Sequence, residues 1–185
     1  MSLTIVIGPM FSGKSSYLLS CIKKHKEAED PVYIITSSLD KRYTSETRIV
    51  GHNKDSCVAD IAVENIMDAM INKKFLKAKV IIIEEAQFYT NLLEFVREAV
   101  DVHKKHLIVA GLDGDINRKP FGEVLQLVPL ADNIIKLKAT CMKCNGLEEA
   151  IFTSRKINNN SIIDIGSSDK YEAVCRYHYI KNKYI

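Results

Sequence analysis

The sequence predicts an α/β domain with a mainly parallel sheet flanked by helices, followed by a small C-terminal lobe. Three observations lead to this prediction. Continuous aliphatic runs of strand length alternate with segments of helical periodicity, which is typical of parallel strands buried on both faces. A glycine-rich loop joins the first run to the first helix, and two pairs of cysteine or histidine residues stand near the C-terminal end. With 185 residues, 46% of them hydrophobic, the chain can bury the core of one domain with a small appendage.

The order of the patterns along the chain places each element of the α/β part. Buried strands are predicted at residues 3–7, 32–36, 80–83 and 106–111, and helices at residues 15–29, 59–74 and 92–103. The character of the sequence changes after Leu137, where short polar and β-prone pieces such as AIFTSRK and SIIDIG surround a run of three asparagines, a predicted turn. We therefore expect one domain over residues 1–140 and a lobe over residues 141–185.

Charge and hydropathy limit the partners that the chain can have. The 26 basic and 23 acidic side chains are spread along the whole sequence, so no basic footprint for nucleic acid or for an anionic membrane is expected. No apolar run is long enough for a spanning helix, and no secretory signal precedes the glycine-rich loop. These features predict a cytoplasmic location.

The glycine-rich loop has the spacing G-x-x-x-x-G-K-S, with glycines at Gly8 and Gly13 followed by Lys14 and Ser15. In such a loop the backbone N–H groups converge on phosphate oxygens, the lysine reaches the β- and γ-phosphates, and the serine hydroxyl supplies a ligand to Mg²⁺. The alternative is a tight glycine turn with a helix-capping serine. The motif predicts a P-loop (RecA-like) α/β fold that binds a nucleoside triphosphate. It does not choose between a motor ATPase, a GTPase switch and a small-molecule kinase.

Two acids follow the aliphatic run VIII, at the carboxyl end of a predicted central strand. Ligands bind at this edge of open α/β sheets. Because neighbouring side chains of a strand point in opposite directions, Glu84 can approach Mg²⁺ while Glu85 faces an acceptor hydroxyl. The alternative is a pair of exposed charges at a strand end.

Four residues near the C-terminal end have the spacing of two zinc knuckles, separated by 30 residues. Three thiolates and one imidazole complete a tetrahedral site and leave no open position, which predicts a structural Zn²⁺ that stabilises a lobe too small to bury a core. A redox C-x-x-C pair and chance spacing are the alternatives. The expected ligands are Cys141, Cys144, Cys175 and His178. Cys21 and Cys57 have no partner at ligand spacing and are predicted to be reduced packing residues, and an odd count of five cysteines argues against a disulfide framework.

Seven segments together resemble the type II thymidine kinase family, and the resemblance covers nearly the whole chain. They are GPMFSGKS at residues 8–15, LDKRY at 39–43, EEAQF at 84–88, GLDGDINRKPFG at 111–122, CMKC at 141–144, SSDKY at 167–171 and CRYH at 175–178. The resemblance implies transfer of the γ-phosphoryl group of ATP to the 5′-hydroxyl of thymidine, with deoxyuridine as a second candidate acceptor, in nucleotide salvage for DNA synthesis. It also implies a homo-oligomer, commonly a tetramer, that is inhibited by dTTP.

The resemblance also assigns residues to the phosphate side of the site. Glu85 falls on the family's general base, Glu84 on the acid that holds Mg²⁺ together with Ser15, and Arg42 on the arginine beside the transferred phosphate. Lys14 and Arg42 complete the catalytic set with Glu85. The residues that would contact ATP or its phosphates are Gly8, Pro9, Met10, Phe11, Ser12, Gly13, Lys14, Ser15, Asp40, Lys41, Arg42, Glu84, Glu85, Ala86 and Gln87.

On the nucleoside side, the resemblance implies an apolar pocket and a lasso loop that closes over the base between the two knuckles. The pocket and lasso residues are Met10, Phe88, Leu112, Ile116, Phe121, Thr153, Ile162, Ile163, Asp164, Ile165, Gly166 and Tyr171.

The sequence departs from the family pattern at four positions. Glu84 replaces the more usual aspartate, Ala86 stands where glycine is common, and Ser167 replaces a second glycine. Ile116 stands where the family usually has a phenylalanine against the thymine. None of these changes removes a catalytic group. Two other classes remain open: a P-loop motor that binds nucleic acid through the zinc lobe, and a nucleotide-binding protein without turnover.

Overall fold

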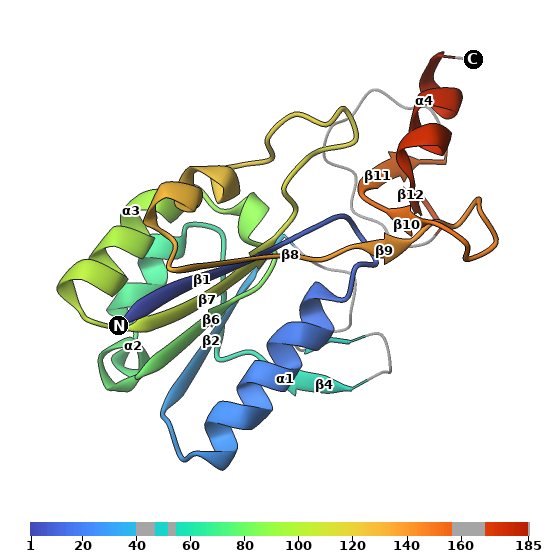
Figure 1. The fold of residues 1–185 in the computed structure, drawn as a ribbon. Coiled ribbons are helices and arrows are strands. Elements are labelled where there is room, and N and C mark those ends of the chain that lie inside the picture. Colours follow the sequence, from blue (N-terminus) through green and yellow to red (C-terminus); the bar gives the residue numbers. More distant parts are fainter. Residues whose placement is uncertain (40–46, 52–54, 157–168, 185) are drawn as a thin grey trace.

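A six-stranded sheet forms the centre of the computed structural model, which describes residues 1–39, 47–51, 55–156 and 169–184 (Figure 1). The strand order is β5-β2-β6-β7-β1-β8, and every neighbouring pair is parallel. The strands are β1 (Ser2–Ile7), β2 (Val32–Ser37), β5 (Ile61–Val63), β6 (Val80–Ile83), β7 (His106–Gly111) and β8 (Asn133–Lys136). The predicted class, a mainly parallel sheet flanked by helices, is confirmed.

Helices cover both faces of the sheet (Figure 1). One face carries α1 (Lys14–Glu27) and a hairpin of β3 (Arg48–Val50) and β4 (Ser56–Val58). The other carries the 3-10 helix η1 (Ile66–Ile71), α2 (Lys73–Lys77), α3 (Leu92–Arg97), its π-helical continuation η3 (Glu98–Val102), and the 3-10 helix η4 (Val124–Leu130). The helices predicted at 15–29 and 92–103 are confirmed.

The strands alternate between these two cores, as their side-chain period of two requires. In β6, Ile81 and Ile83 pack toward α3, whereas Val80 and Ile82 pack toward α1. All four are buried, which explains why the strand reads as a continuous aliphatic run. Strand register then brings the carboxyl ends together, since Ile83 pairs with both Ile35 and Val109. The loops after β1, β2, β6 and β7 therefore meet at one edge.

The helix predicted over residues 59–74 is wrong. Its first part is the edge strand β5, and the rest is η1 followed by the short α2. Two asparagines explain the break, because Asn65 and Asn72 are both extended and each accepts a backbone N–H two residues ahead, from Met67 and Lys74. Each asparagine thus starts a new short helix rather than continuing the preceding segment.

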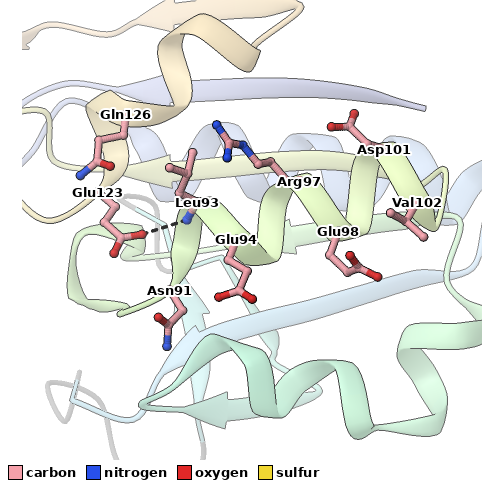
Figure 2. A pocket seen from close by; sticks show the side chains of 9 residues that line it. All are labelled: Asn91, Leu93, Glu94, Arg97, Glu98, Asp101, Val102, Glu123 and Gln126. Atoms are coloured by element: carbon pink, nitrogen blue, oxygen red, sulfur yellow. Dashed lines mark hydrogen bonds between the residues drawn. The ribbon is translucent and has the colours of Figure 1, made fainter.

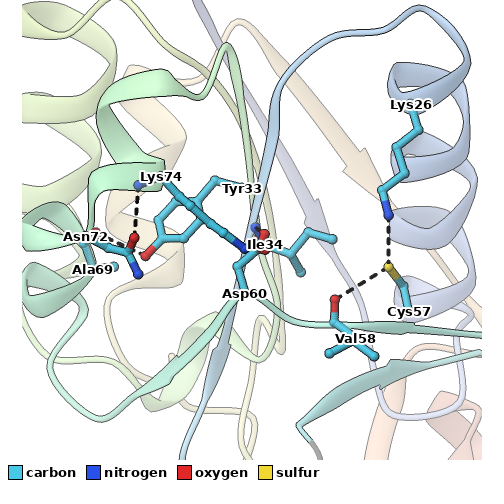
Figure 3. A network of polar contacts seen from close by, with 9 residues as sticks. All are labelled: Lys26, Tyr33, Ile34, Cys57, Val58, Asp60, Ala69, Asn72 and Lys74. Carbon is cyan, nitrogen blue, oxygen red and sulfur yellow. Dashed lines mark hydrogen bonds and ion pairs between the residues drawn. The ribbon is translucent and has the colours of Figure 1, made fainter.

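A network of polar contacts holds this segment against β2 (Figure 3). The Asp60 carboxylate accepts the Ile34 N–H at 2.8 Å and pairs with the Lys74 ammonium at 2.6 Å. On the inner side the Tyr33 hydroxyl donates to the Ala69 carbonyl at 3.1 Å. The segment is therefore anchored by tertiary contacts that its apolar spacing does not encode.

The C-terminal lobe, defined here as residues 139–156 and 169–184, consists of two short antiparallel pairs and one helix. The pairs are β9 (Ala139–Thr140) with β10 (Glu149–Ala150) and β11 (Phe152–Arg155) with β12 (Tyr171–Val174), and α4 (Arg176–Tyr184) ends the described chain. Its own core cluster has seven buried residues, two of them cysteines. The predicted division after residue 140 stays a prediction. No described helix has both the length and the apolar character needed to cross a membrane.

Candidate active site and metal centre

The phosphate loop connects β1 to α1 at the carboxyl edge of the sheet. Gly8 is required at its start, because a Cβ there would lie 2.4 Å from the Leu137 carbonyl oxygen and its φ is 151°. The Lys14 ammonium folds back over the loop and donates to the carbonyls of Gly8 at 3.1 Å and Pro9 at 2.7 Å. Its charge is thus held above the same backbone that is predicted to hold phosphates.

Ser15 and Glu84 meet across the sheet edge. The Ser15 hydroxyl donates to Glu84 Oε1 at 2.5 Å, and the Glu84 side chain is only 6% exposed. Glu84 directly follows β6, and its N–H extends the β2 ladder by donating to the Ile35 carbonyl. A hydroxyl and a carboxylate oxygen are hard ligands of the kind that Mg²⁺ prefers, so this pair fits the predicted cation.

Glu85 turns away from its neighbour because its backbone is left-handed, with φ of 52°. This conformation starts the 3-10 turn η2 (Ala86–Phe88). The Gln87 amide nitrogen donates to Glu85 Oε2 at 2.6 Å, and the Gln87 amide oxygen accepts the Leu112 N–H at 3.0 Å. The two adjacent acids thus have different hydrogen-bond partners.

Several residues predicted on the nucleoside side also come together. The rings of Phe88 and Phe121 pack edge to face with centroids 5.8 Å apart. The Thr153 hydroxyl of β11 accepts the Met10 N–H at 3.0 Å, which ties the phosphate loop to the C-terminal lobe. Leu112 is buried beside Gln87. These contacts join the turn after β6 to the loop after β7, and the phosphate loop to β11.

Other predicted positions are placed differently or lie outside the described residues. Tyr171 is buried in β12, where its hydroxyl accepts a hydrogen bond from Arg155 at 3.0 Å. Ile116 is held through its carbonyl, which accepts the Tyr179 hydroxyl at 2.7 Å. The predicted residues outside the described ranges are Asp40, Lys41, Arg42, Ile162, Ile163, Asp164, Ile165 and Gly166.

The four predicted zinc ligands converge in the C-terminal lobe, with their ligand atoms all within 4.8 Å of one another. The Sγ atoms of Cys144 and Cys175 are 3.8 Å apart, and His178 Nδ1 lies 3.7, 3.2 and 3.4 Å from the sulfurs of Cys141, Cys144 and Cys175. A tetrahedral Zn²⁺ requires sulfurs about 3.8 Å apart and sulfur and nitrogen about 3.5 Å apart. The cluster therefore has the dimensions of a zinc site.

The thiols also differ in their surroundings. Burial raises the pKa of Cys141, but the N–H groups of Cys175 and Lys143 and contacts with Cys144 and His178 outweigh it and lower the value to about 6. Burial and the neighbouring thiols raise the pKa of Cys144 to about 12. One sulfur is thus already stabilised as a thiolate by backbone donors.

Cys21 and Cys57 pack at the margin of the core between α1 and the sheet, as predicted.

Sequence reasoning missed the contacts that join the lobe to the loop after β7. Arg118, left-handed with φ of 63°, places its guanidinium 4.7 Å from the Tyr179 ring centroid and 5.5 Å from that of Phe152. Tyr179 is 2% exposed and directly follows the predicted ligand His178. The position of an aromatic residue next to a predicted metal ligand could have suggested that it packs near the metal site. Sequence spacing could not have predicted its contact with Arg118 in a distant loop.

A separate hollow of about 540 Å³ runs along α3 and η3 (Figure 2). None of the residues that line it was predicted as a site residue. Four acids and Arg97 are among the residues that line it, and Glu123 accepts the Leu93 N–H at 2.9 Å. The hollow shares no residue with the phosphate loop or the metal cluster.

The loop, the serine and the acid at the end of another strand define the P-loop class of nucleotide-binding α/β proteins. A family profile described as thymidine kinase matches residues 1–179. The cytosolic thymidine kinase of Homo sapiens is 38% identical over 184 residues, covering 96% of this chain and 72% of the human protein. The thymidine kinase of Yaba monkey tumor virus is 40% identical over 177 residues (96% and 93%), and that of Oryza sativa subsp. japonica is 37% identical over 184 residues (98% and 67%). The chain belongs to the thymidine kinase family.

Proposed function

We propose that the protein transfers the γ-phosphoryl group of ATP to the 5′-hydroxyl of thymidine, giving the monophosphate and ADP. The observation that carries this proposal is the divergence of two adjacent acids at the end of β6. Glu84 accepts a hydrogen bond from the serine of the phosphate loop, whereas Glu85 accepts one from Gln87, which in turn accepts the N–H of Leu112 in the loop after β7. One strand end thus serves both a phosphate donor and an acceptor.

The phosphate loop binds the donor. Its backbone N–H groups and the positive end of α1 favour phosphate oxygens, and the Lys14 ammonium can exchange the carbonyls of Gly8 and Pro9 for the β- and γ-phosphates. Ser15 and Glu84 would hold Mg²⁺, which would neutralise negative charge on the phosphates. Arg42, which lies outside the described residues, is proposed to support the γ-phosphoryl group during transfer.

Glu85 is proposed to accept the proton of the 5′-hydroxyl as that oxygen attacks phosphorus. Phe88 and Phe121 offer apolar ring surface for the nucleoside, and the hydrogen bond from Met10 to Thr153 joins the phosphate loop to the C-terminal lobe. The lasso over residues 162–166 is proposed to close over the base and to keep water from competing as an acceptor.

We also propose, from family membership, that the protein uses deoxyuridine, is inhibited by dTTP, assembles as a homotetramer, acts in nucleotide salvage in the cytoplasm, and holds a structural zinc.

One assay tests the proposal. The purified protein is incubated with γ-labelled ATP and Mg²⁺, and separately with each deoxynucleoside or with single-stranded DNA. We expect label in thymidine monophosphate, with no stimulation of phosphate release by DNA. DNA-stimulated phosphate release would indicate a nucleic-acid motor, and nucleotide binding without any labelled product would indicate a protein without turnover; either result would overturn the proposal.

A further inference from the structure

We propose that Gln87 is a positioning residue that orients the Glu85 carboxylate and couples it to the backbone of the loop after β7, residues 112–123, here called the acceptor loop. The inference rests on the proposed function, because it assigns Gln87 a part in the work of the proposed base. Gln87 is 3% exposed, and its side chain lies between two groups of opposite hydrogen-bonding character. It bonds to Glu85 Oε2 at 2.6 Å and to the Leu112 N–H at 3.0 Å.

The amide of Gln87 can lie in only one orientation. A backbone N–H is always a donor, so the group that faces Leu112 must be the amide oxygen. The amide NH₂ is then directed at Glu85, where it can only donate. Leu112 thereby selects the donor that the carboxylate receives, and a charged acceptor makes that hydrogen bond a strong one.

Two glycines leave Gln87 little room to move. A Cβ at Gly111 would lie 3.0 Å from the Gln87 amide oxygen. A Cβ at Gly122 would lie 2.4 Å from the Gln87 carbonyl oxygen, and Gly122 has a left-handed φ of 58°. The side chain is therefore enclosed by the end of β7, and the main chain by the end of the acceptor loop.

This enclosure matters because Glu85 has a left-handed backbone at the start of a short turn. Such a residue depends on surrounding contacts to keep its side chain in one direction. Gln87 takes no proton in the reaction and is two residues further along the same turn. Its amide links the carboxylate to Leu112, so the base and the loop that carries Ile116 and Phe121 are held as one unit.

A double-mutant cycle tests this role. Gln87→Met removes both hydrogen bonds at similar volume, and Glu85→Gln removes the base. We expect Gln87→Met alone to lower kcat about 10- to 100-fold with both KM values within about twofold, since a misplaced base affects the chemical step. In the Glu85→Gln background the same change should alter kcat less than about twofold, because the group that it orients no longer accepts a proton.

Two further variants keep the test decisive. Gln87→Glu preserves size and the acceptor for Leu112 but places a second carboxyl group against Glu85. The two acids must then share one proton, which blocks the proposed base, so kcat should fall at least tenfold. Tyr33→Phe, the matched control, removes another buried hydrogen bond of the same sheet and should leave kcat unchanged.

Full kcat in Gln87→Met and Gln87→Glu, or an equal loss in both backgrounds, would overturn the positioning role while leaving the proposed function intact. A wild-type protein that does not phosphorylate thymidine would instead overturn the proposed function.

Discussion

The α/β part and the C-terminal lobe differ in how large an apolar core each one buries. Behind the phosphate loop lie two apolar clusters that use both faces of six parallel strands. The lobe has a cluster of seven buried residues and two-stranded ladders only two to four residues long. A core of that size offers little apolar burial, so a metal bound by the four ligands would stabilise it. In the proposed function the reacting groups lie on the part with the larger core, and the lobe holds the loops around them.

The lobe nevertheless touches both halves of the site. Thr153 holds the phosphate loop through Met10, and Tyr179 holds the acceptor loop through Ile116. Phe11 of the phosphate loop also packs against the lobe core. Loss of metal should therefore act at a distance on substrate binding, whereas loss of an acid on β6 should act on turnover directly.

Removing the acid at the phosphate loop should have the largest effect among changes that leave the base in place. Glu84→Gln removes the charge that pairs with Ser15, so turnover should fall by about 10- to 100-fold and the Mg²⁺ concentration for half-maximal rate should rise. Titration of Mg²⁺ at saturating ATP and thymidine measures both. An unchanged Mg²⁺ requirement would show that this carboxylate does not organise the cation.

Disrupting the metal site should have the next largest effect on activity. Cys144→Ser replaces one thiolate with a poor zinc ligand, so the variant should hold less zinc, unfold its lobe at lower temperature and lose activity mainly through a raised KM for thymidine. Metal analysis and limited proteolysis report the first two changes. Active wild-type protein with less than about half an equivalent of zinc per chain would contradict a structural site.

A smaller change separates the metal from the contact that it supports. Tyr179→Phe keeps the ring against Phe152 and Arg118 but removes the hydroxyl bonded to the Ile116 carbonyl. Loss of one hydrogen bond of about 0.5–1.5 kcal/mol predicts a KM for thymidine raised about two- to tenfold, with zinc content unchanged. If zinc were lost as well, the tyrosine would belong to the metal site rather than to the link.

The last variant probes the nucleoside side of the site and should tighten thymidine binding rather than weaken it. Ile116→Phe adds a flat ring where the family commonly has one, and an aromatic contact of about 0.5–1.5 kcal/mol predicts thymidine binding tightened about two- to tenfold. Steady-state KM for thymidine reports it. An equal or higher KM would show that the site has already compensated for the missing ring.

The same contrast explains how much could be predicted from sequence. Strands such as β1 and β6 were predictable because burial on both faces demands uninterrupted aliphatic residues. The edge strands β5 and β8 were missed because they are short or partly exposed. The helix predicted at 59–74 is wrong because two asparagines cap separate short helices there, and apolar periodicity does not register such caps.

Site residues followed the same division. The phosphate loop, the acid pair and the zinc ligands are local motifs whose spacing already specifies their geometry. The contacts of Gln87 with Leu112 and of Tyr179 with Ile116 join loops that are far apart in sequence, so only the folded chain brings them together.

In the proposed mechanism the end of β6 carries the base while the rest of the site binds and orients the substrates, and the variant Glu85→Gln separates these two roles. The amide keeps the shape of the side chain but cannot accept the 5′-hydroxyl proton, so kcat should fall about 10²- to 10⁴-fold. ATP and thymidine affinities measured by calorimetry should change little, because the phosphate loop and the lobe contacts remain. Retention of more than about a tenth of the wild-type kcat in Glu85→Gln, with Glu84→Gln inactive, would contradict the account and reverse the roles of the two acids.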